Sequence, residues 1–492
     1  MNKDYVLIIP ILFPILAGIV ACFLGKMHLG QKGQRLYETV CLIVEVCLTF
    51  MCFTGNKALD IWKLTTDITI SLKVDDLSRI FAGLTVIVWL LVGIYAFEYL
   101  EDDPKSNLFF GFYLITEGLI AALSFADNMI TFYMFFEMMT LMSVPLVMHD
   151  GTHEAIMAGL KYLFYSIAGA FLTLFGIFML IPYGVLGSFT AGGIMNMEAL
   201  AGHDLRLMIS AICMIIGLGT KAGMFPMHAW LPTAHPEAPA PASAVLSGVI
   251  TKTGVLGIIR TVYFCIGSRL IAGTWVQNTW IVLSLITVIM GSMMAYREKQ
   301  LKKRLAYSTV SQVSYIMFGL AVMNGTAFMG AVAHVVFHSL IKTTLFLMSG
   351  AVIHKTGHHL VSELKGTGKE MPITMWCYTI VSIALVGIPP LSGFVSKWYI
   401  ATGALMSGEK PYSWIGPVAL LISALLTAGY LLSISIQGFM PGADYDYEHL
   451  ENKEPSAYMY IPMILMTIAT IFLGIVPGGL TRIIDTIANT IF

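Results

Sequence analysis

Long apolar runs recur along the whole chain, and they decide what it can fold into. A membrane-spanning helix needs about 20 predominantly apolar residues. Of the chain's residues 57% are hydrophobic and 12% are charged, which lies outside the range of soluble globular proteins. We therefore predict an all-α, polytopic membrane protein with about 14 transmembrane helices, at residues 5–25, 36–55, 77–98, 107–126, 128–148, 155–181, 205–227, 241–265, 276–295, 304–323, 327–353, 372–408, 414–438 and 457–477.

Two of these segments contain helix-breaking stretches. MFPMHAWLPTAHPEAPAP follows Lys221 in the seventh segment, and GIPPLSGFVSK (387–397) interrupts the twelfth. Proline removes an N–H donor and clashes with the preceding turn, so we predict that helices 7 and 12 are broken. Breaks that lie five helices apart are what two inverted five-helix repeats would give. The predicted units are an N-terminal three-helix region (1–106), a first repeat (107–265), a second repeat (266–438), and a C-terminal loop with the last helix (439–492).

Ionisable residues within the apolar segments are the candidate functional residues. They are expensive to insert, at roughly 2.5–3.5 kcal/mol for a lysine, and they require a partner or a water-filled cavity. Glu137 lies near the middle of the fifth segment, and Lys221 lies where the seventh helix breaks. Desolvation favours the neutral forms of both groups, whereas pairing favours both charged forms. The sequence therefore predicts a Glu137–Lys221 switch, whose separation sets the proton affinity of the lysine.

Two further lysines belong to the same hypothesis. Lys252 lies inside the eighth segment between two threonines, and Lys397 follows the Pro389-Pro390 break. Structural interpretations stay open, since a buried glutamate can be a neutral hydrogen-bonded acid and a lysine can extend to the interface. We assign no role to the other ionisable residues in or near the segments, namely Glu45, Glu117 and Lys161.

The eleventh segment places His334, His338 and Lys342 at i, i+4 and i+8, on one helix face. Two histidines at i, i+4 can bind a metal ion, but no third ligand is visible. We favour a hydrogen-bonded proton wire, because imidazoles titrate near neutral pH. Histidines that pack against backbone groups are the alternative. The seven cysteines are scattered without a C-x-x-C motif, so we expect neither a metal site nor a bound cofactor.

Basic residues in the connections predict the orientation. They concentrate after odd-numbered helices, at residues 26–35, 297–304 and 355–369, and positive loops stay in the cytoplasm. Both termini are therefore expected on the non-cytoplasmic side of the cell's inner (plasma) membrane. We interpret REKQLKKR (297–304) as an orienting loop, with a docking surface as the alternative. Residues 60–73 are expected to be extended outside the bilayer, and residues 183–204 to form a loop with a short interfacial helix.

Several motifs resemble one known family. They are Glu137 in its helix, KAGMFPMHAWLPTAHPEAPAPASAVLSGVITKTG (221–254), AHVVFHSLIKTTLFLMSG (333–350) and PPLSGFVSKW (389–398). These motifs are similar to those of the antiporter-like family shared by proton-pumping subunits of respiratory complex I, large subunits of Mrp cation/proton antiporters, and subunits of membrane-bound hydrogenases. The resemblance implies that Glu137 and Lys221 form a modulating pair, that Lys252 is the central relay beside His334 and His338, and that Lys397 opens to the outer side.

Departures from the family pattern indicate which type of subunit in the family the chain resembles. Only TRIIDTIANTIF (481–492) follows the last predicted helix, so the lateral arm of the distal complex I subunit is not expected, and Lys397 stands where some paralogues have glutamate. The chain is most similar to a D-type Mrp subunit or to its hydrogenase relative. The expected function is proton translocation within a multisubunit complex, with other hydrophobic subunits, lipid, H⁺ and possibly Na⁺ as partners.

Other functions are kept as alternatives. One is an antiporter-like subunit of a redox-driven complex, and another is a membrane scaffold that transports nothing. The chain has no cysteine cluster, paired haem ligands or G-x-G-x-x-G unit, so we expect no catalytic centre of its own. A net charge of −1 gives no electrostatic reason to expect nucleic acid as a partner.

Overall fold

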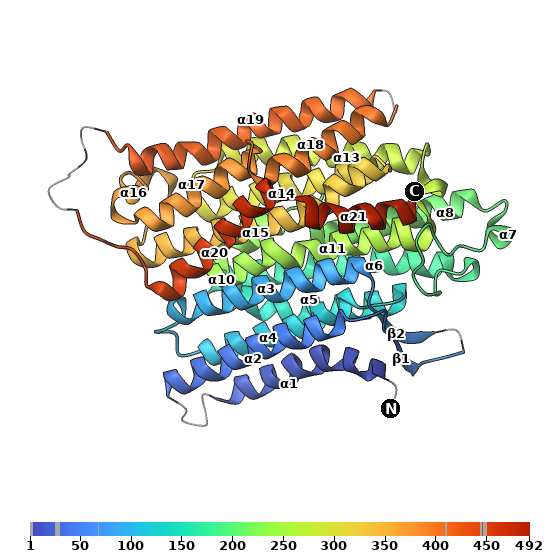
Figure 1. Ribbon diagram of the computed structural model, residues 1–492, viewed down its shortest axis with the longest axis horizontal. Helices are drawn as coiled ribbons and strands as arrows, with labels where there is room; N and C mark the ends of the chain where they lie inside the picture. Colours follow the sequence, from blue (N-terminus) through green and yellow to red (C-terminus); the bar gives the residue numbers. More distant parts are fainter. Residues whose placement is uncertain (1–2, 25–29, 67, 409–410, 443–444, 446–449) are drawn as a thin grey trace.

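The structure, a computed structural model, describes residues 3–24, 30–66, 68–408, 411–442, 445 and 450–492. Lys26, one of the basic residues used for the predicted orientation, lies outside these residues. The long helices run side by side along one axis of the molecule (Figure 1). Unbroken long helices are α1 (Ile9–Leu24, preceded by the short η1, Lys3–Ile8), α2 (Gln31–Cys52), α3 (Asp76–Tyr99), α4 (Ser106–Ser124), α5 (Met129–Val147), α6 (His153–Leu180), α13 (Trp275–Arg297), α14 (Leu301–Ala321), α15 (Gly325–Thr356), α19 (Tyr412–Phe439) and α20 (Ala457–Ile475).

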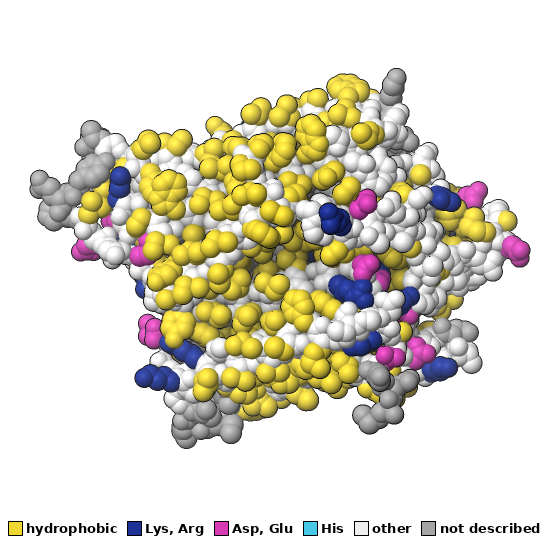
Figure 2. Space-filling view, in the orientation of Figure 1, with side chains coloured by type: hydrophobic (Ala, Val, Ile, Leu, Met, Phe, Trp, Pro, Cys, Tyr) yellow, Lys and Arg dark blue, Asp and Glu magenta, His cyan; other side chains and the backbone are white. Residues whose placement is uncertain are grey.

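The chain is a helical multi-pass membrane protein, as predicted. Within the described residues, eleven helices are long and apolar enough to cross a membrane. The other three predicted segments are helical as α2, α14 and the α17–α18 pair, but they are shorter or more polar, so the number fourteen stays a prediction. Hydrophobic side chains cover most of the face seen in Figure 2, and many charged side chains lie towards its two ends.

Both predicted helix breaks are present. The seventh helix, α8 (Asp204–Ala222), ends at Gly223 in the left-handed region (φ +79°) and resumes as α9 (Leu231–Glu237). The twelfth is divided into α17 (Pro372–Val386) and α18 (Ser392–Met406), with Gly387 at φ +96°. Glycine adopts such angles without the penalty of a Cβ atom, and it therefore ends both helices. The inverted repeats and the domain boundaries remain predictions.

The eighth helix is less regular than the sequence suggested. It consists of α10 (Ala240–Val245), a π-helical turn η4 (Leu246–Ile250), α11 (Thr251–Ile259) and a second π-helical segment η5 (Arg260–Ile266). All of it is buried. A π-helical turn shifts the i→i−4 hydrogen-bond pattern and often occurs at functional sites. Short helices elsewhere are η3 (Ile181–Tyr183), α7 (Met197–Leu200), α12 (Ser268–Ile271), η6 (Val361–Glu363) and α16 (Thr367–Glu370).

The extended excursion is confirmed as a β hairpin. Strands β1 (Ala58–Lys63) and β2 (Thr69–Lys73) pair antiparallel, with an irregularity between Asp60 and Trp62. The segment 183–204 is a loop that contains only the four-residue α7. The hairpin projects from the end of the bundle towards which η1 and the end of α21 also lie (Figure 1).

A final helix, α21 (Gly478–Ile491), was expected only as a tail. It buries Ile484, Ile487, Ala488 and Ile491 at i, i+3, i+4 and i+7, which is the spacing of an amphipathic helix. This apolar stripe packs against α15. The search for membrane spans missed the helix because it has 14 residues, fewer than the roughly 20 apolar residues that a span needs.

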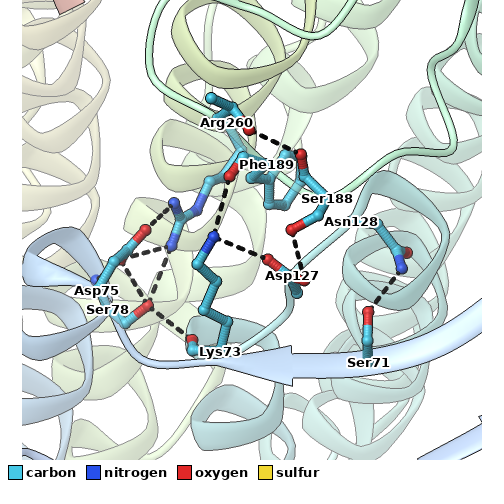
Figure 3. A network of polar contacts seen from close by, with 10 residues as sticks. Ser71, Lys73, Asp75, Ser78, Asp127, Asn128, Ser188, Phe189 and Arg260 are labelled. Carbon is cyan, nitrogen blue, oxygen red and sulfur yellow. Dashed lines mark hydrogen bonds and ion pairs between the residues drawn. The ribbon is translucent and has the colours of Figure 1, made fainter. Parts of the chain in front are cut away.

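A polar network ties the hairpin to the membrane helices (Figure 3). The Arg260 guanidinium in η5 donates to both carboxylate oxygens of Asp75, at 2.5 and 2.9 Å. Asp75 also caps α3 by accepting from the Ser78 N–H at 2.8 Å. Beside it, Lys73 of β2 lies 3.6 Å from the Asp127 carboxylate. We call Asp75, Ser78 and Arg260 the end clasp, since they join the start of α3 to the end of the Lys252 helix.

Charge and hydrogen bonding also act on the proton affinity of Asp75. Burial alone raises the pKa of this carboxyl, but the Arg260 charge and the hydrogen bonds from Arg260 and Ser78 outweigh it and lower the pKa to about 2. Asp75 is therefore ionised at every physiological pH. The clasp is a complete ion pair in the folded protein.

We expect close packing at the second helix break to limit substitution of Gly474. The end of α20 touches this break, and a Cβ atom on Gly474 would lie 2.4 Å from the Pro390 carbonyl oxygen and 2.4 Å from the Ser392 nitrogen. Overpacking of this kind costs about 1–3 kcal/mol. Gly474→Ala is expected to lower the melting temperature of the purified complex. Gly479→Ala on α21 is the control, because an added Cβ there meets nothing within 4 Å; equal melting temperatures would contradict the packing argument.

Candidate functional site: a buried file of lysines and histidines

Lys221 lies in the last turn of α8, and only 1% of it is exposed. Its ammonium donates to the Tyr162 hydroxyl at 2.8 Å and to the Ser166 hydroxyl at 3.2 Å, both on α6. The ammonium also lies 4.4 Å from the centroid of the Tyr162 ring, within range of a cation–π interaction. Hydroxyl groups and an aromatic face therefore replace water around this buried cation.

The helix break and the Lys221 site form one packed unit. The Tyr162 ring packs against Trp230 at a tilt of 37°, with 4.6 Å between centroids, and the Trp230 indole N–H donates to the Thr220 carbonyl at 2.8 Å. Carbonyls in the last turn of a helix lack the regular intrahelical donor, and the Thr220 carbonyl accepts from the Gly223 N–H at 3.1 Å and from the indole instead. Sequence reasoning missed Tyr162, Ser166 and Trp230. The available signal was the i, i+4 spacing of Tyr162 and Ser166 on an apolar helix.

Glu137 lies on α5 but does not form a direct ion pair with Lys221. Among the described side chains, no nitrogen–oxygen contact within 4 Å joins the two, although their charges interact. Glu137 is half-buried and its Oε1 atom has no hydrogen-bond partner in the part of the chain that is described. Tyr162 accepts from Lys221 and also shares a 2.8 Å hydrogen bond with Ser143 of α5. The predicted pair is thus separated, and hydroxyls connect its two helices.

Lys252 lies at the start of α11, directly after the π-helical turn η4. Its ammonium donates to the Ser247 carbonyl, which also accepts from the Thr251 hydroxyl at 3.0 Å. In a regular α-helix this carbonyl would accept from the N–H four residues later. The widened turn thereby gives the buried ammonium an acceptor from its own helix. The α11 backbone also lies close to α8, since a Cβ on Gly254 would be 3.1 Å from Lys221 Cβ.

A chain of polar contacts connects Lys252 with Lys342 of α15. The Ser247 hydroxyl lies 2.7 Å from the Thr309 hydroxyl on α14, and Thr309 donates to the Leu305 carbonyl at 3.0 Å. The Lys342 ammonium donates to the same carbonyl at 3.0 Å. Both lysines are fully buried. The Lys252 helix, α14 and α15 therefore contribute to one series of polar contacts, in which the Ser247 carbonyl holds Lys252 and the Ser247 hydroxyl contacts Thr309.

Two histidines, His338 and His334, lie four and eight residues before Lys342 on α15. His334 and His338 stack with 5.6 Å between ring centroids, as their i, i+4 spacing predicted. His334 Nδ1 lies 2.8 Å from the Ser396 hydroxyl of α18. Both ring nitrogens of His338 are buried and have no partner among the described residues. Buried polar atoms of this kind are normally hydrogen-bonded, often by ordered water, so the region suits a water-assisted proton path.

Lys397 lies at the second helix break. We call the series Lys221, Lys252, Lys342, His338, His334 and Lys397 the lysine–histidine file. Its ammonium donates to the carbonyls of Leu385 and Val386 at 2.5 and 3.1 Å, in the last turn of α17. It also lies 4.7 Å from the centroid of the Tyr315 ring, and Tyr315 stacks on His334 at 5.9 Å. The second break therefore supplies backbone acceptors to a cation. The charges of Lys252, Lys342 and Lys397 all act on His338.

Several buried basic residues escaped the sequence analysis. His235 of α9 is fully buried, stacks on Phe346 at 4.6 Å, and interacts electrostatically with Lys252, Lys302 and Lys342. Lys302 donates to the Ala238 carbonyl at 2.8 Å, and 7% of it is exposed. Only part of 297–304 is a loop, because α14 begins at Leu301 and directs Lys302 into the protein; the orienting role of this segment stays a prediction. Arg304 is buried as well and donates to the Tyr430 carbonyl at 3.0 Å.

Two known families match parts of this chain. A family described as NADH:quinone oxidoreductase/Mrp antiporter, TM, matches residues 126–427, which is more than half of the chain. The chain belongs to this family. A second one, described as NADH-Ubiquinone oxidoreductase (complex I), chain 5 N-terminus, matches residues 63–110. The antiporter-like resemblance predicted from the motifs is thereby confirmed.

Relatives within the family fall into more than one kind of complex. The N subunit of the NADH-quinone oxidoreductase of Desulforudis audaxviator is 31% identical over 425 residues, which are 82% of each chain. The D-type subunit of the Na(+)/H(+) antiporter of Bacillus subtilis is 28% identical over 487 residues, which are 98% of this chain and 96% of the relative. A chain in the Mrp complex from Dietzia sp. DQ12-45-1b superposes with a TM-score of 0.85 at 19% identity, covering 100% and 98% of the two chains. At that identity the superposition shows a common fold.

Proposed function

We propose that the chain is a proton-translocating, antiporter-like subunit of a multisubunit membrane complex, and that the complex is a Mrp-type Na⁺/H⁺ antiporter. The proton pathway consists of Glu137, Lys221, Lys252, His334, His338, Lys342 and Lys397. The observation that carries this proposal is the series of polar contacts between the Lys252 helix, Thr309 of α14 and Lys342 of α15, with the two stacked histidines on the same face of α15 as Lys342. The lysine ammonium groups, buried among hydroxyls and backbone carbonyls, are the groups that gain and lose protons.

Repulsion between neighbouring cations couples the protonation state of each lysine to that of the next. Charges interact more strongly in the protein interior than in water, so the lysines of the file disfavour simultaneous protonation. When Glu137 is ionised it favours the charged form of Lys221, and when Glu137 is neutral that support is lost. A proton released by Lys221 changes the field at Lys252, and the change passes along the file to Lys397. The side-chain hydroxyls of Ser247 and Thr309 can donate and accept, whereas backbone carbonyls only hold the ammonium groups in place.

The extent of the D-type similarity supports the assignment to an antiporter. The Bacillus subtilis antiporter relative aligns over almost the full length of both chains. The second candidate function is a pumping subunit of a redox-driven complex, and the 31% identity to a quinone oxidoreductase subunit favours it. In both cases the partners are other hydrophobic subunits of the complex. We place the chain in the plasma membrane with both termini outside, in keeping with η1 and the end of α21 lying towards one end of the bundle (Figure 1).

A transport assay on the whole complex separates these candidates. Inverted membrane vesicles that contain the complex are given a transmembrane pH gradient, and a pH-sensitive dye reports proton movement. For an antiporter, added Na⁺ is expected to collapse the gradient without any electron donor. Proton movement that requires an electron donor and ignores Na⁺ would instead assign the chain to a redox-driven complex. A complex that moves no protons under either condition would favour the scaffold alternative.

A further inference from the structure

Two glutamates outside the lysine–histidine file are fully buried. Glu45 lies on α2 and Glu117 on α4, and both are 0% exposed. Glu45 Oε1 accepts from the Thr49 hydroxyl at 3.0 Å. The other three carboxyl oxygens of the two residues have no hydrogen-bond partner among the described residues. The carboxyl groups lie close enough for their charges to interact.

Within the part of the chain that the structure describes, no cation neutralises these carboxyl groups. Helices α1, α4 and α5 contain no lysine, arginine or histidine, and Arg79 of α3 is engaged with Asp76. The nearest cations act elsewhere, Arg35 on Glu38 and Lys57 on Cys52. The titratable neighbours on α1, α2 and α4 are all neutral or acidic, namely Cys22, Tyr37, Glu38, Cys41, Cys52 and Tyr113.

Glu45 and Glu117 therefore cannot both be ionised. Desolvation disfavours each charge, and two like charges in one site disfavour each other. An isolated buried carboxylate normally takes up a proton to become neutral. The pair must accordingly hold at least one proton at a pH where ordinary glutamates are ionised.

One face of α2 connects the pair with the end of the bundle. Glu38, Cys41, Glu45 and Thr49 are all buried and lie at i, i+3, i+7 and i+11, so they follow one helix face. Glu38 accepts from the Gln34 amide at 3.0 Å and lines a recess in the surface at that end. Glu45 lies about 10 Å deeper along the helix axis, from a rise of about 1.5 Å per residue. Cys41, between them, interacts electrostatically with Glu38 and Glu117.

We propose that Glu45 and Glu117 form a proton-binding carboxyl pair, separate from the lysine–histidine file and loaded through Glu38 from this recess. The ligand is a proton. It leaves water in the recess, binds the Glu38 carboxylate and passes inward, so that only O–H bonds form and break. The proposal does not depend on the proposed transport function, because proton binding can be observed without transport.

Infrared spectroscopy of the purified complex tests the pair directly, since protonated carboxylic acids have their own carbonyl stretch. The spectrum is recorded about 3 pH units above the ordinary glutamate pKa of about 4.3. The double substitution Glu45→Gln/Glu117→Gln is expected to remove the part of the protonated-acid band that the pair contributes in the wild type. A spectrum that the double substitution does not change would overturn the pair. A wild-type band that disappears when Na⁺ is added at constant pH would make the site a sodium site instead.

The loading route through Glu38 is tested separately, by the rate at which the acid exchanges its proton. In D₂O the band shifts as the acid exchanges its proton, and Glu38→Gln is expected to slow this shift at least several-fold while leaving the part of the band that Glu45 and Glu117 contribute unchanged. Glu101→Gln, at the exposed rim of the same recess, is the control and is expected to exchange at the wild-type rate. An unchanged exchange rate in Glu38→Gln would overturn the route.

A measurement on the wild-type complex avoids any dependence on the folding of variants. A hydrophobic carbodiimide adds to a protonated buried carboxylic acid, and rearrangement leaves a stable N-acylurea on that residue. Mass spectrometry is expected to find this adduct on Glu45 or Glu117 and to find less of it as the pH rises. Absence of the adduct from both residues, while other buried acids in the complex react, would count against the proposal.

Discussion

Replacing Lys221 with alanine is expected to stop proton movement completely while the complex stays assembled. Among the described residues, the substitution removes the only cation that donates to Tyr162 and Ser166, so a charge change at Glu137 has nothing to act on. Proton uptake into inverted vesicles is expected to fall to the level of vesicles without the complex. Tyr162→Phe removes one hydrogen bond to a charged group, worth about 1.5–3 kcal/mol. It is expected to slow uptake roughly 10-fold or more, since 1.4 kcal/mol corresponds to tenfold.

The matched control for this series is Lys161→Ala. Lys161 lies on the same helix as Tyr162, but it is half-buried and donates to the Thr233 hydroxyl at 2.8 Å. Its loss is expected to leave uptake near the wild-type rate. Subunit content is measured on the purified complexes, so that lost assembly is not mistaken for lost transport. Wild-type uptake in Lys221→Ala would remove Lys221 from the pathway and favour a scaffold role.

Breaking the end clasp is expected to cause the largest loss of stability. Arg260 is 2% exposed and holds Asp75 with two hydrogen bonds, so Arg260→Gln leaves an uncompensated carboxylate. Removing one partner of a fully buried ion pair costs about 3–5 kcal/mol. The cost here is expected to be somewhat smaller, because 28% of the Asp75 side chain is exposed. Arg269→Gln, an exposed arginine that follows η5, is expected to leave the melting temperature almost unchanged.

The same clasp predicts a pH dependence with a definite sign. The pKa of Asp75 is about 2 in the folded protein and about 3.9 in an unfolded chain. A lowered folded-state pKa means that the stabilisation is fully present above about pH 4 and is lost as the pH falls towards 2. The melting temperatures of the wild type and Asp75→Asn are therefore expected to converge over that range. A constant difference down to pH 2 would show that the Asp75 charge does not contribute to stability.

The breaks and the histidine face could be predicted because local rules decide them. Proline and glycine end α8 and α17 whatever lies around them, and i, i+4 spacing brings His334 and His338 together in any α-helix. Apolar runs located the long helices for the same reason. The amphipathic α21 escaped because the criterion applied was length, although the spacing of its apolar residues was present in the sequence.

The solvation of the lysines could not be predicted, because it depends on tertiary packing. Nothing local to Lys221 shows that Tyr162 of another helix will bind its ammonium. The π-helical turn before Lys252 adds one residue to a turn, which apolar periodicity does not reveal in a segment buried on all sides. Lys302 was interpreted from its basic neighbours, yet the start of α14 turns it inward to the Ala238 carbonyl. Charge patterns in sequence therefore locate basic residues without saying which of them become buried.

Glu137 lies at the outer surface of the folded subunit, and this position has a consequence for assembly. It is half-buried on α5, beside Met138 and Leu141, which are 43% and 51% exposed. Whatever covers this face, acyl chains or another subunit, becomes part of the dielectric medium around the carboxyl group. Coulomb energy varies inversely with the effective dielectric constant, so a change from about 20 to about 10 doubles the influence of Glu137 on Lys221. The lipid or subunit that covers this face thereby determines how strongly the charge of Glu137 acts on Lys221.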